Sequence, residues 1–391
     1  MRVAMTCNYP VDPRIVPGGV TAVAHHLVKG LGRLPGIDLH VVCCQRDVPR
    51  DSVEERDGAT VHFLTNSDRL SLTLDSWLQR RKIAKTMKRI APDLVHAQGL
   101  GLSTAAAIDS GRPFVVSLHG IIWKEGYIHL PTWKRRMRGR LRARRAWRQI
   151  LRTENVVITS GYAAEVLPAE HEYRTFVLNN PVSERVFEIR NEPRSPHVLL
   201  VGGTRQRKDP LTALRTMQRV LAELPEATMS IVGPPSGTRL DREVDEWIAA
   251  RGLGDRIAVR GLVPEEVLFA EYERASVVLL TSVEETAPVA IGEAYAVGIP
   301  VVGTAAGGIP HMVRDGETGF VRPVGDDAAL AAAVLGLLRR PEKRARLAAR
   351  ARETGESDFG LSAIARKTVE VYEEILRTPT VRGSRVRPSP V

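Results

Sequence analysis

The stretch SVEETAPVAIGEAYAVGIPVVGTAAGGIP, residues 282–310, places two carboxylates, Glu285 and Glu293, where a strand-like run meets a helix-like run. The β-branched run SVVLLTS at 276–282 leads into it, and the apolar run IPVVGT at 299–304 follows the helix-like segment. Strand, helix and strand in this order, with continuously apolar strands, predict a parallel sheet covered by helices on both faces.

The same alternation extends along most of the chain. A first series has strands at 2–7, 39–44, 93–97, 113–118, 155–159 and 175–179, with helices at 20–34, 76–91 and 100–109. A second series has strands at 197–202, 228–233 and 257–261, with helices at 210–223, 239–251, 264–274 and 288–297. The segment 179–196 contains three prolines and no apolar period, which is typical of an interdomain linker.

We therefore expect two α/β domains that face each other across a cleft, an N-terminal domain at 1–185 and a C-terminal domain at 186–360. An amphipathic helix at 361–377 is a candidate to pack back on the first domain. The tail 378–391, rich in proline, serine and arginine, is predicted to be disordered. In open sheets of this kind, ligands bind beyond the carboxyl ends of the strands, so residues just after strands are the candidates for function.

Composition excludes several classes of protein. The 391 residues are 43% apolar and 26% charged, and no apolar run approaches the roughly 18–20 residues that span a bilayer. The N-terminus lacks the hydrophobic segment of a signal peptide, so we expect a cytoplasmic protein. Cys7, Cys43 and Cys44 have neither zinc-site nor disulfide spacing and are predicted to be buried thiols, and no metal motif is visible.

The opening stretch predicts a site for a phosphorylated sugar. Proline favours the first helical turn, so we expect the helix to start at Pro288. Its unpaired amides and dipole favour a phosphate. A carboxylate repels phosphate, so Glu285 and Glu293 are expected to bind hydroxyl groups attached to it, as in a nucleotide sugar; the alternative is two solvated carboxylates.

Other strand ends carry residues suited to the same ligand. Gly307 and Gly308 follow the strand 299–304 and would let backbone approach a ligand closely. Three cations follow the strand 197–202 and can neutralise a diphosphate, although a solvated loop is the alternative; they are Arg205, Arg207 and Lys208.

The first domain has two further candidates. Gly18 and Gly19 lie between the first strand and the first helix, where they serve either phosphate binding or a turn. His119 ends the strand 113–118, and its imidazole can donate to a hydroxyl or a developing charge unless local backbone satisfies it. His96 has the same placement, but we interpret it as structural.

Over residues 1 to 377 the chain resembles the retaining glycosyltransferases of family 4, which have the GT-B fold of two facing Rossmann-like domains. The resemblance rests on Glu285, seven residues, Glu293 and Ala294, followed by GIPVV, GGIP and DGETGF. It implies that Glu285 contacts the donor sugar and that Glu293 holds the ribose. Arg207 and Lys208 resemble the family's basic pair, Gly18 and Gly19 resemble its glycine loop, and His119 is similar to its active-site histidine beside the sugar. We therefore expect four catalytic residues, His119, Arg207, Lys208 and Glu285. The expected donor-binding residues are Gly18, Gly19, Gly203, Arg205, Pro288, Val289, Glu293, Gly307 and Gly308.

Several positions depart from the family pattern. Gly202 and Gly203 stand where the family has Gly-Arg, and Thr286 to Pro288 replace a usual glycine. His311 replaces a common glutamate after GGIP. Where the family usually has Asn-Gly-Val, this chain has Asn180, Pro181 and Val182.

The resemblance implies transfer of a hexose, with retention and without a metal or other cofactor, from a nucleoside diphosphate sugar to a saccharide or lipid-linked saccharide. A UDP-sugar is the expected donor, and cell-surface polysaccharide or glycolipid synthesis is the expected role. An epimerase of the same fold and a non-catalytic sugar-binding protein are the alternatives. The formal charge of +11 would also attract nucleic acid, but the basic residues are not accompanied by the aromatic residues on which bases stack.

Much of the positive charge lies in LPTWKRRMRGRLRARRAWRQILR, residues 130–152, which contains no acidic residue. Five apolar residues recur near helical spacing, namely Leu130, Trp133, Met137, Leu141 and Trp147. One interpretation is a helix that docks on anionic lipid at the inner face of the plasma membrane. The other is a solvated helix whose apolar stripe packs on the domain.

Overall fold

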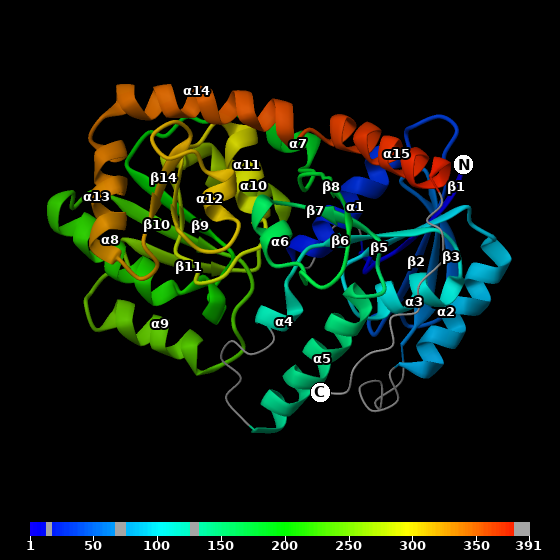
Figure 1. Ribbon diagram of the computed structural model, residues 1–391. Coiled ribbons are helices and arrows are strands. Elements are labelled where there is room, and N and C mark those ends of the chain that lie inside the picture. Colours follow the sequence, from blue (N-terminus) through cyan, green and yellow to red (C-terminus); the bar gives the residue numbers. More distant parts are fainter. Residues whose placement is uncertain (13–17, 67–75, 126–132, 379–391) are drawn as a thin grey trace.

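The computed structural model describes residues 1–12, 18–66, 76–125 and 133–378, and shows two α/β domains side by side (Figure 1). The expectation of two parallel-sheet domains is confirmed. The predicted tail and Leu130 lie outside the described residues, apart from Thr378.

The described part of the N-terminal domain is built on an eight-stranded sheet of order β3-β4-β2-β1-β5-β6-β7-β8, parallel except for β3. Its strands are β1 Arg2–Thr6, β2 Asp38–Gln45, β3 Ser52–Arg56, β4 Ala59–Thr65, β5 Leu94–Gln98, β6 Phe114–Leu118, β7 Asn155–Ile158 and β8 Arg174–Val177. Its helices are α1 Gly19–Leu31, α2 Trp77–Ile90, α3 Leu102–Ser110, α4 Ile122–Glu125, α5 Trp133–Ile150 and α6 Gly161–Glu165.

The second sheet has six parallel strands in the order β11-β10-β9-β12-β13-β14. They are β9 His197–Val201, β10 Thr228–Val232, β11 Ile257–Gly261, β12 Val277–Leu280, β13 Val301–Thr304 and β14 Gly319–Arg322. The short helix α7 Glu184–Phe187 lies within the linker. The helices that follow the linker are the 3-10 turn η1 Gln206–Lys208, α8 Pro210–Glu223, α9 Arg239–Ala249, α10 Glu265–Arg274, α11 Val289–Val297, α12 Ile309–Met312, α13 Asp327–Leu338, α14 Pro341–Asp358 and α15 Leu361–Arg377.

Both sheets are buried on both faces, which explains their continuously apolar strands. In the N-terminal domain, α1 and α15 pack on one face, where Val3, Met5 and Tyr372 are fully buried. On the other face α2, α3 and α5 contribute Ile83, Ala107 and Ile150 to a second buried cluster. The three cysteines are buried free thiols, as predicted.

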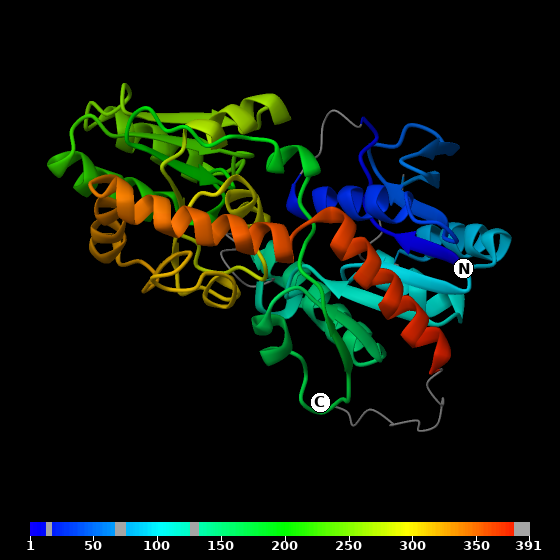
Figure 2. The same ribbon diagram turned by 90° about the horizontal axis from the view of Figure 1, so that it is seen from above.

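The chain passes between the domains twice. It leaves the N-terminal domain after β8 and returns between α14 and α15, and the two crossings are hydrogen-bonded to each other: Val182 N–H donates to Phe359 O at 3.2 Å. Figure 2 shows α14 and α15 running one after the other across both domains. The N-terminal domain is therefore completed by residues 361–377, which pack against α1.

Several sequence predictions need correction. The helix expected from Pro288 begins at Val289, because Pro288 is its N-cap with extended backbone. The linker contains the short helix α7, and the predicted series omitted β3, β4, β14, α13 and α14. By contrast, α8 spans 210–223 as predicted, since the Asp209 carboxylate accepts from Thr212 N–H and Pro210 occupies the first turn.

Candidate functional site

The site lies where loops at the carboxyl ends of the strands of both sheets meet. Gly18 is the N-cap of α1, and a Cβ atom on Gly19 would lie 3.6 Å from Cγ2 of Val289, the first residue of α11. The N-terminal ends of α1 and α11, from different domains, therefore converge. The first N–H groups of a helix lack acceptors one turn earlier and its dipole is positive at this end, so the two N-terminal ends together favour an anion.

Glu285, in the loop between β12 and α11, is buried and holds two cations. Its Oε1 lies 2.5 Å from Lys208 Nζ and accepts from Ser282 Oγ at 2.9 Å, while Oε2 accepts from Arg207 Nη1 at 2.9 Å. Burial alone would raise the pKa of this carboxyl, but Lys208 and Arg207 more than offset burial, and the pKa is lowered. Glu285 is therefore a carboxylate.

The three predicted residues Arg207, Lys208 and Glu285 thus form one cluster rather than separate cation and hydroxyl sites. β9 and β12 are neighbours in the sheet, so the loops that follow them lie together. The Lys208 side chain is 11% exposed and that of Arg207 is 35% exposed, so Arg207 presents the larger cationic surface. Arg205 is exposed at the start of η1.

Glu293, half-buried on α11, is oriented by a buried tyrosine. Tyr272 OH donates to its Oε2 at 2.6 Å, and Tyr272 itself is fully buried on α10. Burial raises the pKa of the Glu293 carboxyl. A carboxylate oriented by a hydrogen bond at one oxygen is suited to accept hydroxyl hydrogens from a ligand at the other.

The predicted glycines bring protein loops together. A Cβ on Gly307 would lie 2.0 Å from Glu285 O, and one on Gly308 would lie 1.8 Å from Thr286 O. Gly308 N–H donates to Glu285 O at 2.7 Å, so this amide is used within the protein. These glycines position the Glu285 loop; the close approach that they permit is to backbone.

Gly203 has a comparable role. A Cβ there would lie 2.1 Å from Pro234 O, and Gly203 N–H donates to Val232 O at 2.9 Å. The loop that leads to Arg207 and Lys208 is thereby fixed against the loop after β10.

His119 follows β6 and is half-buried beside the linker. Its Nε2 lies 2.6 Å from Gln98 Oε1, and burial lowers the pKa of the imidazole to about 4, so the ring is neutral near pH 7. The linker residue Asn180 donates from Nδ2 to Ala287 O at 3.0 Å, which ties the linker to the loop before α11. His96 is buried and contacts Ser117 and Tyr372.

Contacts between the domains were missed at the level of sequence. Ser160 Oγ donates to Thr286 O at 2.6 Å, and Tyr162 OH donates to Glu284 Oε1 at 2.7 Å. Both residues sit at the start of α6, and neither belongs to a motif that sequence reasoning could have used. They hold the Glu285 loop against the N-terminal domain.

Among the helices that the structure describes, none combines the length and the apolar character needed to cross a membrane. In the same part of the chain, no three His, Cys, Asp or Glu side chains gather in a way that could hold a metal ion.

Comparisons with known proteins agree with this geometry. A family model described as "Glycosyltransferase Family 4" matches residues 17–185, and one described as "Glycosyl transferases group 1" matches residues 183–354. Among curated proteins, the D-inositol 3-phosphate glycosyltransferase of Streptomyces scabiei is 36% identical over 194 residues, 47% of this chain and 43% of that protein. That of Streptomyces coelicolor is 33% identical over 186 residues, 46% of this chain and 40% of that protein. The chain therefore spans less than half the length of these relatives.

Solved structures are similar over nearly the whole chain. Sucrose-phosphate synthase from Thermosynechococcus elongatus superimposes with a TM-score of 0.79 at 20% identity, covering 96% of this chain and 99% of that one. HepE from Anabaena, in complex with UDP and glucose, gives 0.72 at 18% identity, covering 96% and 100%. At these identities the likeness establishes the fold, which is GT-B as the sequence predicted.

Proposed function

Because the chain belongs to glycosyltransferase family 4, we propose that it transfers a hexose from a nucleoside diphosphate sugar to an acceptor hydroxyl. The observation that carries this proposal is the buried Glu285 with Lys208 and Arg207, placed in the loop that leads to the N-terminal end of α11. Cations and helix amides suit the diphosphate, and the carboxylates of Glu285 and Glu293 suit the hydroxyls on either side of it.

The reaction retains the anomeric configuration and needs no metal. The bond between the sugar C1 and the diphosphate oxygen breaks, and its electron pair leaves with the phosphate. The acceptor oxygen bonds to C1 on the same face, and its proton passes to the departing phosphate oxygen. Arg207, Lys208 and the N-terminal ends of α1 and α11 offset the charge that develops there.

The proposed donor is a UDP-sugar, supported by the similar HepE structure that is in complex with UDP-glucose. The proposed acceptor is a saccharide or lipid-linked saccharide in cell-surface polysaccharide or glycolipid synthesis. The donor test compares the thermal stability of the wild type and Glu293→Ala with UDP, GDP and ADP. A nucleotide at about a hundred times its dissociation constant adds roughly 2.7 kcal/mol.

Hydrogen bonds to a charged group contribute about 1.5–3 kcal/mol each, so loss of two bonds from Glu293 to the ribose weakens binding at least about a hundredfold. The exposed Glu317 provides the matched control, Glu317→Ala, which keeps nucleotide stabilisation. Equal stabilisation of the wild type and Glu293→Ala would contradict the donor site. Analysis of products with and without an acceptor then separates transfer from epimerisation.

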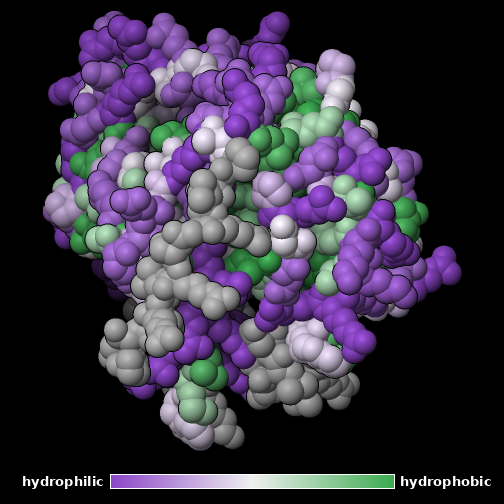
Figure 3. Space-filling model, turned by 45° about the vertical axis from the view of Figure 1, so that its right-hand side comes forward, coloured by the Kyte–Doolittle hydropathy of each residue, from purple (hydrophilic) through white to green (hydrophobic). Residues whose placement is uncertain are grey.

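The place of action that we propose is the anionic inner face of the plasma membrane. Trp133, Met137 and Leu141 on α5 are 67%, 51% and 44% exposed, so a large part of these three side chains faces away from the described part of the domain. Trp77 and Leu78 on α2 are also exposed, and α2 covers the same face of the sheet as α5. Neither helix contains an acidic residue. Figure 3 shows small hydrophobic spots amid hydrophilic surface in the lower part of this side.

Exposed apolar side chains among basic ones fit a negatively charged bilayer, to which each basic residue near the surface contributes about 1 kcal/mol. Vesicle pelleting tests this: the wild type is expected to bind vesicles that contain phosphatidylglycerol and not pure phosphatidylcholine. Replacing Trp133, Met137 and Leu141 by serine is expected to weaken binding. A control variant, Val259→Ser/Leu262→Ser, removes exposed apolar groups from the other domain. Equal binding of both variants, or no preference for anionic lipid, would remove the membrane proposal.

A further inference from the structure

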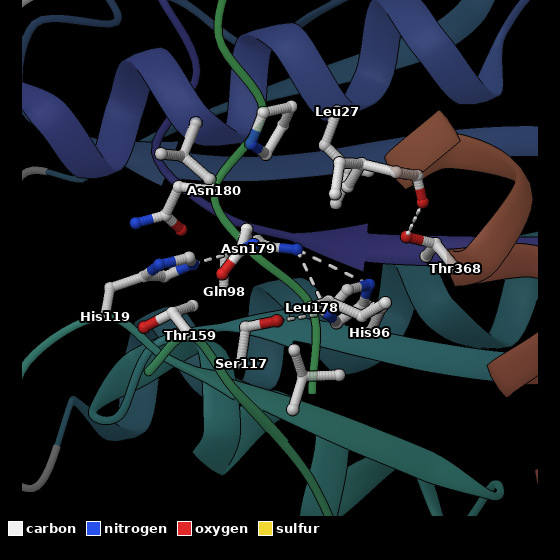
Figure 4. A pocket seen from close by; sticks show the side chains of 14 residues that line it. Leu27, His96, Gln98, Ser117, His119, Thr159, Leu178, Asn179, Asn180 and Thr368 are labelled. Atoms are coloured by element: carbon white, nitrogen blue, oxygen red, sulfur yellow. Dashed lines mark hydrogen bonds between the residues drawn. The ribbon is translucent and has the colours of Figure 1, made fainter. Parts of the chain in front are cut away.

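A row of polar side chains runs from the cleft into the N-terminal domain. His96 and Gln98 lie two apart on β5, and Ser117 and His119 lie two apart at the end of β6, so all four point to one face of the sheet. Figure 4 shows them lining one pocket beneath the linker residue Asn180. On this face α15 supplies Tyr372, which is fully buried.

The side chains in this row are linked by hydrogen bonds. His119 Nε2 lies 2.6 Å from Gln98 Oε1, and Gln98 Nε2 lies 3.1 Å from His96 Nε2. The same His96 nitrogen lies 2.7 Å from Ser117 Oγ, and His96 Nδ1 lies 2.6 Å from Tyr372 OH. The chain of contacts therefore connects a helix near the C-terminus to the cleft histidine.

The chemistry of an amide gives this chain a direction. The oxygen of Gln98 can only accept, so His119 carries its proton on Nε2. The nitrogen of Gln98 can only donate, and it lies nearer to His96 Nε2, at 3.1 Å, than to His96 Nδ1, at 3.4 Å, so we assign the lone pair to His96 Nε2. His96 is then protonated on Nδ1 and donates to Tyr372 OH. Burial lowers the pKa of His96 to about 3 and that of His119 to about 4, so both rings hold a single proton near pH 7.

We propose that Gln98, His96 and Tyr372 are positioning residues that fix the proton of His119 on Nε2, so that His119 Nδ1 is a hydrogen-bond acceptor in the pocket. Among the described residues, neither His119 Nδ1 nor Asn180 Oδ1 makes a hydrogen bond of ordinary geometry, although the Asn180 side chain lies close enough to the His119 ring to raise its pKa and so to oppose part of the effect of burial. Asn180 is 6% exposed and lines the same pocket. Two neighbouring acceptors suit a ligand that donates hydrogens; that this ligand is a hydroxyl of the donor sugar rests on the proposed function.

This assignment differs from the sequence-based expectation that His119 donates a hydrogen bond. It also gives α15 a role in the site, because Tyr372 is the acceptor at the far end of the chain of bonds. Without that hydroxyl, a proton on His96 Nδ1 is buried unpaired, which is costly. The proton then moves to His96 Nε2, the Gln98 amide turns over, and its N–H group meets His119 Nε2. The proton of His119 is thereby displaced to Nδ1.

The test is the tautomer of His119 in the full-length protein, read from two-bond proton–nitrogen correlations of ¹⁵N-histidine at pH 7.5. The chain has ten histidines, and the signals of His119 are identified by their loss in His119→Gln. We expect a proton on Nε2 in the wild type and on Nδ1 in Tyr372→Phe. A control, Tyr9→Phe, removes another buried hydroxyl of this domain, which bonds Asp57, and keeps the wild-type tautomer.

A proton on Nδ1 in the wild type, or the same tautomer in the wild type and Tyr372→Phe, would overturn the proposal. If Tyr372→Phe fails to fold, Gln98→Glu provides the second test, because a carboxylate in place of the amide accepts only and stabilises an imidazolium. We expect His119 to keep its proton on Nε2 and its pKa to rise by at least one unit; an unchanged pKa would overturn the chain.

Titration of the same samples with UDP separates this inference from the proposed function. The expected tautomers in a protein that does not bind UDP would support the chain of bonds and contradict the donor site. Binding of UDP by a wild type whose His119 is protonated on Nδ1 would support the donor site and contradict the chain of bonds.

Discussion

Removal of the Lys208 ammonium by Lys208→Met is predicted to destabilise the protein through the carboxylate that it leaves behind. Lys208 Nζ lies 2.5 Å from Glu285 Oε1, and the two side chains are 11% and 4% exposed. Loss of one partner of such a buried pair costs about 3–5 kcal/mol, because the other charge stays out of water. Arg207 still holds the second oxygen at 2.9 Å, so we expect the lower end, about 3 kcal/mol.

A second substitution separates burial of charge from ligand binding. In Lys208→Met/Glu285→Gln neither buried charge remains, and replacing a buried ion pair by neutral groups of similar volume is often close to neutral in stability. We expect the double variant to recover most of the lost stability. It is not expected to regain stabilisation by UDP, because it lacks Lys208 and Glu285, which we propose to contact the donor.

Urea denaturation followed by circular dichroism measures both effects. A loss of about 3 kcal/mol is a decrease of roughly 150-fold in the folding equilibrium constant. If Lys208→Met costs less than about 1 kcal/mol, the pair is effectively solvated and the reasoning from burial is refuted. If the double variant is as unstable as the single one, the loss comes from packing of the lysine stem.

Two further predictions concern stability. Burial lowers the pKa of His96 to about 3 and of His119 to about 4, against about 6.5 for a free imidazole, so the unfolded chain binds protons between about pH 6.5 and 4 that the folded chain does not. The free energy of unfolding should therefore decrease as the pH is lowered through that window, by about 2 kcal/mol per histidine at pH 5. Equal urea midpoints at pH 7 and 5 would contradict this. Gly308→Ala, whose Cβ would meet Thr286 O at 1.8 Å, should lower Tm through an overpacking cost of about 1–3 kcal/mol. The control Gly336→Ala, in open space within α13, should raise stability by about 0.5–1 kcal/mol, and a similar loss in both would refute the steric argument.

The sequence predicts elements well where local chemistry marks both ends. Asp209 and Pro210 mark the start of α8, and the amphipathic period of 361–377 matches α15. The hairpin of β3 and β4 was missed although a signal exists: Asp57 and Gly58 have φ of 52° and 75°, as a tight Asp-Gly turn requires. The alternating strands around that turn could have been recognised.

The candidate site shows a different limit. Glu285 and Lys208 are 77 positions apart, and sequence reasoning gave them separate ligand groups. Their contact follows from the order of strands, since β9 and β12 are neighbours, and no local pattern contains that order. Tyr372 is further removed still, because its role depends on a helix that returns from the other domain.

The return of α15 to the first domain has a consequence for synthesis. The ribosome delivers β1 and α1 first, but the helix that covers them, Leu361–Arg377, emerges after the whole second domain. At about 5–20 residues per second, translation of the residues between α1 and α15 takes roughly 15–65 seconds. During that time the nascent chain carries an uncovered apolar face, on which chaperones can act. The domain that is made first is therefore finished last, and a fragment that stops at the linker lacks part of its own core.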